Sequence, residues 1–167
     1  NGMIEDTILG PLTTKQRLDG VEKLVETTKK EGGKILCGGK KPANFNKGYY
    51  FEPTIFDEVK DNFTIMKEEP FGPIVPILTF KSFEEVIERA NNNDLGLCSY
   101  IYTNDLRKAT KASELMETGC VAVNTAAVAV AEAPFGGIKQ TGYGREGGSM
   151  AIKDYLNIKY SHFGISY

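Results

Sequence analysis

The chain has 167 residues, of which 41% are hydrophobic and 25% charged, and its 22 acidic side chains nearly balance its 20 basic ones. Because the net charge is only −2 and the basic residues are mixed among acidic ones, the chain lacks the basic surface of a non-specific nucleic-acid binder. The longest apolar run, residues 120–131, contains Asn124 and Thr125 and falls short of the roughly 20 residues that a membrane span needs. We therefore expect no nucleic-acid partner and no membrane partner. The length predicts one domain that folds without cross-links.

The three cysteines, Cys37, Cys98 and Cys120, are far apart in the sequence, and each is next to apolar or β-forming residues. An odd number of widely separated cysteines does not indicate a disulfide framework, and the single histidine, His162, has no cysteine near it. We expect no metal site, a reducing cytoplasmic location, three cysteines packed in the core, and His162 on the surface.

The first 60 residues predict one helix followed by short strands. Thr13 and Gln16 have the spacing of a capping box, and apolar residues then recur at helical spacing until the glycine pair at 32–33. The β-forming segments that follow are 34–37, 49–51 and 54–56.

From residue 73 onward, strands and helices alternate. The expected strands are 74–80, 98–102 and 121–123. Ser82 with Glu85 caps the first intervening helix, and Asn104 caps the second. The inner face of this second helix is expected to be Leu106, Ala109, Ser113 and Met116. This alternation predicts βαβ crossovers and therefore an α/β fold with a mostly parallel twisted sheet and flanking helices. A last helix at about 146–155 and an edge strand at 157–163 complete the chain.

Seven of the 18 glycines lie between Gly119 and Gly148, after the last predicted inner strand. In an open α/β sheet the working surface lies beyond the carboxyl ends of the strands, so a site is expected near residues 124–137. Residues 142–147 fit the G-x-G-x-x-G pattern of a dinucleotide-binding loop. That pattern needs a strand directly before it and an acidic residue about 20 positions later. The preceding residues are polar and glycine-rich, which favours a packed glycine loop.

Glu68 and Glu69 come directly before the turn-forming segment 70–73. One interpretation is a solvated acidic pair before a turn. The other is a carboxylate held at the entrance of a strand, where it accepts hydrogen bonds from the hydroxyl groups of a ligand. Spacing alone leaves both interpretations open.

Four segments, taken together and in order, resemble the NAD(P)-dependent aldehyde dehydrogenases. They are Gly10-Pro11-Leu12; Glu68-Glu69-Pro70-Phe71-Gly72-Pro73; Asn91 with Leu95-Gly96-Leu97; and Pro134-Phe135-Gly136-Gly137-Ile138-Lys139-Gln140-Thr141-Gly142-Tyr143-Gly144-Arg145-Glu146. The resemblance extends over about residues 8–162. It implies a thiolate that attacks an aldehyde, hydride transfer to NAD or NADP, and hydrolysis of the thioester with a glutamate as base.

The family's nucleophilic cysteine, base glutamate and dinucleotide-binding domain precede the segment seen in this chain, and no catalytic residue is expected among its 167 residues. Because the chain also begins with Asn and not with Met, we expect a C-terminal fragment that is inactive by itself. Residues 1–149 would be the C-terminal part of the catalytic domain, and residues 150–167 the end of a terminal helix and an oligomerisation strand.

The resemblance also implies roles for individual residues. Glu69 matches the glutamate that holds the ribose hydroxyls beside the nicotinamide, and Phe71 matches the aromatic residue next to that ring. Phe135 matches an aromatic residue of the substrate funnel, and Ala129 and Val130 lie in the loop over the funnel mouth. Neighbouring segments resemble the branch that oxidises succinate semialdehyde or 2-oxoglutarate semialdehyde. Enzymes for succinate semialdehyde commonly have a serine where this chain has Ala129 and Val130, so the aldehyde stays open.

The tail at residues 157–163 matches the strand through which family members pair into dimers and tetramers, so a homo-oligomer is expected. The alternative to an enzyme portion is a non-catalytic truncated paralogue that serves as an oligomerisation module. A nucleophile motif and a dinucleotide-binding domain encoded in frame before this chain would favour the enzyme.

Overall fold

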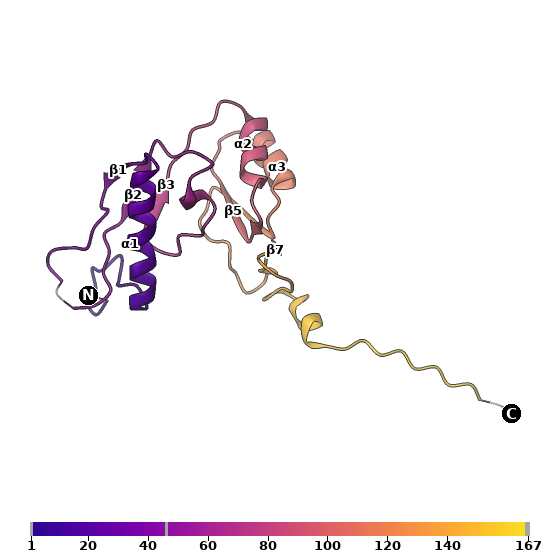
Figure 1. The fold of residues 1–167 in the computed structure, drawn as a ribbon. Helices are drawn as coiled ribbons and strands as arrows, with labels where there is room; N and C mark the ends of the chain where they lie inside the picture. Colours follow the sequence, from indigo (N-terminus) through magenta and orange to yellow (C-terminus); the bar gives the residue numbers. More distant parts are fainter. Residues whose placement is uncertain (1, 46, 166–167) are drawn as a thin grey trace. The chain divides into compact units, whose positions relative to one another are not determined.

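Residues 2–45 and 47–165 are described by a computed structural model, in which the chain divides into two units, Asn1–Phe80 and Lys81–Tyr167 (Figure 1). Each unit combines helices with small sheets, which confirms the predicted α/β class. The described strands form three small sheets and not one continuous sheet. The predicted domain boundary between residues 149 and 150 stays a prediction. No described helix has the length and apolar character needed to cross a membrane.

The first unit begins with helix α1 (Lys15–Lys30), which Thr14 caps by accepting a hydrogen bond from the Arg17 amide. The predicted cap at Thr13 is therefore wrong by one residue. Two adjacent threonines offer the same hydroxyl, and sequence spacing does not distinguish between them. The helix ends where Gly32 adopts a φ of 106°, as the glycine pair predicts.

The sheet of the first unit has the strand order β1 (Lys34–Cys37), β2 (Thr54–Asp57) and β3 (Ile74–Pro76). The β1–β2 pair is antiparallel and the β2–β3 pair is parallel. The predicted strand at 49–51 is absent, because the backbone there bonds to loops: the Leu12 amide donates to the Tyr49 carbonyl. The strand predicted at 74–80 ends at Pro76, since its partner β2 ends at Asp57.

One hydrophobic core joins α1 to this sheet. Its buried members are Leu18, Val21, Leu24, Val25, Phe51, Phe56, Val59, Phe63, Ile65 and Ile74. Each such side chain contributes about 1.5–3 kcal/mol on transfer out of water. The core therefore fixes α1 against β2 and β3.

The second unit contains helix α2 (Phe83–Asn91), strands β4 (Leu95–Gly96) and β5 (Cys98–Ile101), helix α3 (Leu106–Leu115) and strand β6 (Cys120–Val123). Ser82 caps α2 through the Glu85 amide, as predicted. Strands β5 and β6 are parallel, with α3 as the connection between them, which confirms the predicted crossover. The cap of α3 is Asp105 and not Asn104. Its buried residues are Ala109 and Ala112, while Leu106 and Ser113 are exposed, so the predicted inner face is only partly right.

The end of the chain differs most from the prediction. Strand β7 (Ile138–Lys139) pairs antiparallel with β4, and the predicted helix at 146–155 shrinks to the 3₁₀ helix η2 (Ala151–Tyr155). Gly147 and Gly148 have φ values of 69° and 62°, which lie outside the right-handed helical region. Residues 156–165 are extended and exposed, without strand pairing among the described residues (Figure 1). The oligomerisation strand therefore stays a prediction.

Candidate functional site

The predicted cofactor residues Glu69 and Phe71 lie in the connection between the 3₁₀ helix η1 (Thr64–Met66) and β3. In this connection the Phe71 amide donates to the Glu69 carbonyl at 2.9 Å, and the Ile74 amide donates to the Gly72 carbonyl at 2.8 Å. Two consecutive three-residue turns result. The backbone that carries Glu69 and Phe71 is therefore held by its own hydrogen bonds.

The side chains of Glu69 and Phe71 are both exposed. In the part of the chain that the structure describes, no hydrogen bond or ion pair reaches the Glu69 carboxylate. The Arg17 guanidinium lies over the Phe71 ring, 5.4 Å from its centre, yet 69% of Phe71 is exposed. A carboxylate with no internal partner can accept hydrogen bonds from sugar hydroxyls, and an exposed aromatic face can pack on a flat heterocycle. The two side chains therefore have the chemistry that the family resemblance implies for contacts with a ribose and a nicotinamide.

Gly72 brings this connection into direct contact with α1. A Cβ atom at Gly72 would lie 2.6 Å from Cγ2 of Val21, which is buried in the core. Any larger residue would push the turn away from the helix. Glycine is therefore required at this position by close packing.

The predicted funnel loop follows β6 and starts from a fixed point at Asn124. The Asn124 side chain accepts from the Thr103 amide and donates to the Thr103 carbonyl, both at 2.9 Å. These bonds tie the end of β6 to the residues that follow β5. In the loop, Ala129 and Val130 are exposed and Phe135 is half-buried. The structure thus brings the three predicted funnel residues into one loop of the second unit.

The glycine-rich segment packs behind the funnel loop. Phe135 and Glu146 exchange backbone hydrogen bonds of 2.7 Å in both directions, and the Gly148 amide donates to the Ala131 carbonyl. No α-helix follows residues 142–147 within the described chain, so the G-x-G-x-x-G pattern lacks the strand–turn–helix context of a dinucleotide-binding loop.

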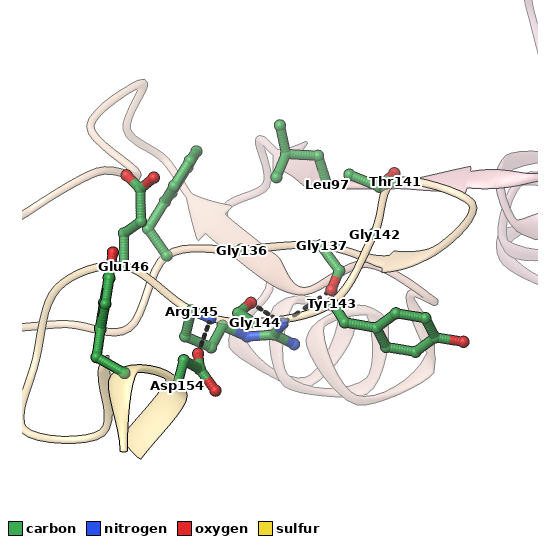
Figure 2. Close-up of a pocket in the computed structure, with 12 residues that line it drawn as sticks. Leu97, Gly136, Gly137, Thr141, Gly142, Tyr143, Gly144, Arg145, Glu146 and Asp154 are labelled. Atoms are coloured by element: carbon green, nitrogen blue, oxygen red, sulfur yellow. Dashed lines mark hydrogen bonds between the residues drawn. The ribbon is translucent and has the colours of Figure 1, made fainter. Parts of the chain in front are cut away.

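A pocket of about 530 Å³ lies between these segments, with Phe135, Leu97 and Arg145 among its lining residues (Figure 2). The Arg145 guanidinium donates to the carbonyls of Gly137 at 2.8 Å and Gly144 at 2.7 Å. The Arg145 amide donates to the Asp154 carboxylate at 2.6 Å. The Arg145 guanidinium thus links Gly137 to Gly144, and both of these glycines line the pocket.

Lys139 anchors the other end of the same loop. Its ammonium donates to the carbonyls of Asn91 and Asn93, at 2.8 and 3.0 Å, and pairs with the Glu117 carboxylate at 2.6 Å. The two carbonyls belong to the carboxyl end of α2, where a cation is favourable. The Thr141 hydroxyl accepts from the Gly96 amide at 2.8 Å. Strand β7 is thereby held against β4 and α2, and two residues separate Phe135 from the start of β7.

The three cysteines are free thiols in the structure. Cys37 is exposed, which corrects its prediction as a core residue: it lies on the edge strand β1. Cys98 and Cys120 are half-buried and lie opposite each other in the β5–β6 pair. Burial raises the pKa of the Cys98 thiol, and the neighbouring Cys120 adds to the rise. His162 is exposed on the tail, near the Tyr160 hydroxyl.

The sequence prediction gave no role to Arg17 or Lys139. Each of them acts through a partner distant along the chain: Arg17 contacts Phe71, and Lys139 reaches the end of α2. Periodicity and motif spacing carry no signal for such pairs. Lys139 is included in the sequence prediction only as a member of the segment 134–146, which resembles the aldehyde dehydrogenase family.

Comparison with known proteins identifies these segments. The model of the aldehyde dehydrogenase family matches residues 1–161. The chain is 43% identical to a chloroplastic betaine aldehyde dehydrogenase of Beta vulgaris over 151 residues, covering 90% of this chain and 30% of the relative. It is 39% identical over 165 residues to the NADP(+) succinate-semialdehyde dehydrogenase GabD of Escherichia coli strain K12, covering 99% and 34%. The chain thus spans about a third of the length of these relatives.

A solved structure shows the same fold. The NAD+ complex of an aldehyde dehydrogenase from Bacillus cereus superposes with a TM-score of 0.90 at 42% identity, covering 95% of this chain and 32% of that one. By its motifs, its family match and its fold, the chain belongs to the aldehyde dehydrogenase family.

Proposed function

We propose that this chain forms the C-terminal portion of an enzyme that oxidises an aldehyde to a carboxylic acid with NAD or NADP. The observation that carries the proposal is the Glu69 carboxylate, which is exposed, has no hydrogen bond or ion pair with any described residue, and lies on a hydrogen-bonded turn beside Phe71. In this role Glu69 accepts hydrogen bonds from the ribose hydroxyls, and Phe71 packs beside the nicotinamide. The cofactor, when bound, supplies the acceptor for the hydride.

The two acidic residues provide a matched test of this role. In the complete gene product that contains this chain, Glu69→Gln should weaken NAD or NADP binding about ten-fold, because hydrogen bonds to a charged group contribute about 1.5–3 kcal/mol. Glu68→Gln removes the same charge one residue earlier and should leave binding unchanged. The measurement is cofactor titration by fluorescence of the reduced nicotinamide. Equal effects from both substitutions would contradict the assignment.

For the substrate, we propose an aldehyde with a distal carboxylate, such as succinate semialdehyde or 2-oxoglutarate semialdehyde. Support comes from the similarity to the succinate-semialdehyde enzyme, which extends to 99% of this chain. The relative named for betaine aldehyde points to a substrate of opposite charge. Ala129 and Val130 give the loop an apolar surface, so carboxylate recognition would depend on residues outside this loop. Comparing kcat/KM for succinate semialdehyde and betaine aldehyde decides between the two charges.

The isolated chain is proposed to be inactive, because it spans only about a third of the length of the enzymes that it resembles. Its tail is proposed to pair with a second copy: Ile158, Tyr160 and Phe163 are 102%, 83% and 85% exposed, which is typical of apolar residues that are covered on assembly.

The cytoplasmic location also stays a proposal. The alternative, a truncated oligomerisation module, predicts that no upstream nucleophile motif is encoded in frame. Sequencing the gene before this chain separates the two.

A further inference from the structure

Near both of its ends, helix α1 contacts the segment 64–72, which consists of η1 and the connection that carries Glu69 and Phe71. At the carboxyl end of the helix, the Glu31 carboxylate accepts hydrogen bonds from the Thr64 amide at 3.0 and 3.1 Å and from the Thr64 hydroxyl at 2.6 Å. At its amino end, the Arg17 guanidinium covers one face of Phe71. Between these two points Val21 packs against Gly72.

The Glu31 contact acts on Thr64, the first residue of η1. The Thr64 carbonyl accepts hydrogen bonds from the amides of Lys67 and Glu68, at 3.0 and 2.9 Å. Thr64 therefore takes part in two sets of hydrogen bonds. Its amide and hydroxyl donate to Glu31, and its carbonyl accepts from the turn that leads into Glu69. The Glu31 carboxylate fixes where this turn starts, because two donors of Thr64, its amide and its hydroxyl, bond to the same charged group.

The Arg17 contact acts on the end of the connection. A guanidinium over an aromatic face is attracted by the ring's negative face, and it favours one orientation of the ring. The side chain of Phe71 is otherwise mostly exposed, and Arg17 is the cation that lies over it in the described chain. With one face covered by Arg17, the opposite face is the one presented to a ligand.

We infer that Arg17 and Glu31 are positioning residues for the cofactor site, through which α1 sets the orientation of Phe71 and the start of the turn that carries Glu69. The inference rests on the proposed role of Glu69 and Phe71 and adds two residues that do not touch the cofactor. It predicts that losing either contact weakens cofactor binding while the core of the unit stays folded, because both residues are exposed and lie outside that core.

The test uses NAD and NADP as probes on the complete gene product. Arg17→Gln should raise the KM and the Kd for the cofactor about three-fold, the range expected for an exposed cation–π contact. Arg17→Lys keeps the cation and should restore most of the affinity. Glu31→Gln should raise both constants about five-fold. In each case kcat at saturating cofactor and the KM for the aldehyde should stay unchanged.

Two exposed residues on the same helix serve as matched controls. Lys15→Gln removes a cation that pairs with Asp19, and Glu26→Gln removes a carboxylate that pairs with Lys29. Neither contacts the connection in the described structure, and neither should change cofactor affinity. If Arg17→Gln or Glu31→Gln lowers kcat or thermal stability without changing the cofactor KM, the residue is structural only and the inference is wrong.

Glu69→Gln, measured alongside, separates the two proposals. If Glu69→Gln leaves cofactor affinity unchanged, the proposed site is wrong. If Glu69→Gln weakens binding but the Arg17 and Glu31 variants do not, the site stands and the positioning role is overturned. Amide hydrogen exchange over residues 64–72 adds a readout that needs no cofactor: exchange should accelerate there in Glu31→Gln and not in Glu26→Gln.

Discussion

The two units of this chain are stabilised in different ways. The first contains ten buried apolar side chains of valine size or larger in one cluster. In the described part of the second, the buried apolar side chains are those of Ala109, Ala112 and Ala122. Three methyl groups remove little surface from water, so the second unit depends more on polar contacts such as those of Lys139.

This difference affects the proposed cofactor residues of the first unit and the proposed funnel residues of the second unit separately. In the first unit, the connection with Glu69 lies against a hydrophobic core, and its turns keep their own hydrogen bonds. In the second unit, the bonds that stabilise the fold are the same bonds that hold the funnel loop around Phe135. Stability and site geometry should therefore be separable in the first unit and coupled in the second.

The largest effect should come from Phe56→Ala. Phe56 has no exposed surface, and removing its ring should cost about 3–5 kcal/mol of unfolding free energy. Chemical denaturation measures the loss, and amide exchange should show it in β2. Phe80→Ala is the control, because that ring is 56% exposed and should contribute little. Similar losses from both would contradict the assigned core.

Gly119→Ala should be the next largest change, and it tests the second unit. A Cβ atom there would meet the carbonyl oxygen of Gly136, a backbone atom that cannot turn aside. Forcing these segments apart should cost about 1–3 kcal/mol or more. Gly20→Ala is the matched substitution in α1, where nothing lies within 4 Å; it should stabilise by about 1 kcal/mol. Opposite signs in the two denaturation curves are expected, and equal signs would refute the close approach.

Lys139→Met tests the polar network directly. The substitution keeps the length of the side chain but removes a cation with three partners, and it should cost about 1–3 kcal/mol. Lys15→Met is the control: its ion pair with Asp19 is also 2.6 Å, but its side chain is 72% exposed against 24% for Lys139. An exposed pair contributes at most about 1 kcal/mol. If Lys15→Met lowers the free energy of unfolding as much as Lys139→Met does, the burial of the lysine does not determine how much its ion pair contributes.

The helices were the most predictable part of the fold. Ser82 caps α2 as predicted, because a capping box is a local pattern that needs no distant partner. The predicted helix at 146–155 is wrong in its first half, because Gly147 and Gly148 have left-handed backbone angles. In this conformation both glycines pack against the funnel loop. Their conformation is set by contacts with residues 131–134, which local spacing does not reveal.

For the candidate site, the motifs select Glu69, Phe71 and Phe135, whose roles stay predictions, but not the residues that hold them. Glu31 and Thr64 are 33 positions apart, and Lys139 and Asn91 are 48 apart. A side chain that bonds to a residue so far away leaves no periodic trace in the sequence. The chemical groups of a site are therefore predictable from motifs, whereas their support requires the fold.

The smallest effect concerns the cysteines, which report on each unit separately. Cys37 in the first unit is exposed, whereas Cys98 in the second is half-buried and has its pKa raised by burial. Iodoacetamide reacts with the thiolate, so Cys37 should be alkylated first at pH 8 and Cys98 more slowly. Peptide mapping of partially labelled protein measures the order. Faster labelling of Cys98 would mean that the second unit opens more readily than its polar network implies.

The same raised pKa also predicts a pH dependence of stability. Below the ordinary thiol value of 9.0, Cys98 is protonated in both the folded and unfolded chains, and its contribution to stability is constant. As the pH rises above 9.0, the unfolded chain loses this proton before the folded chain does, so the free energy of unfolding falls. Cys98→Ala should remove that part of the alkaline loss. The unsubstituted chain and Cys98→Ala differ at this one thiol, so comparing their denaturation series between pH 7 and pH 10 measures how much burial of Cys98 contributes to the loss, and equal losses would contradict the burial of this thiol.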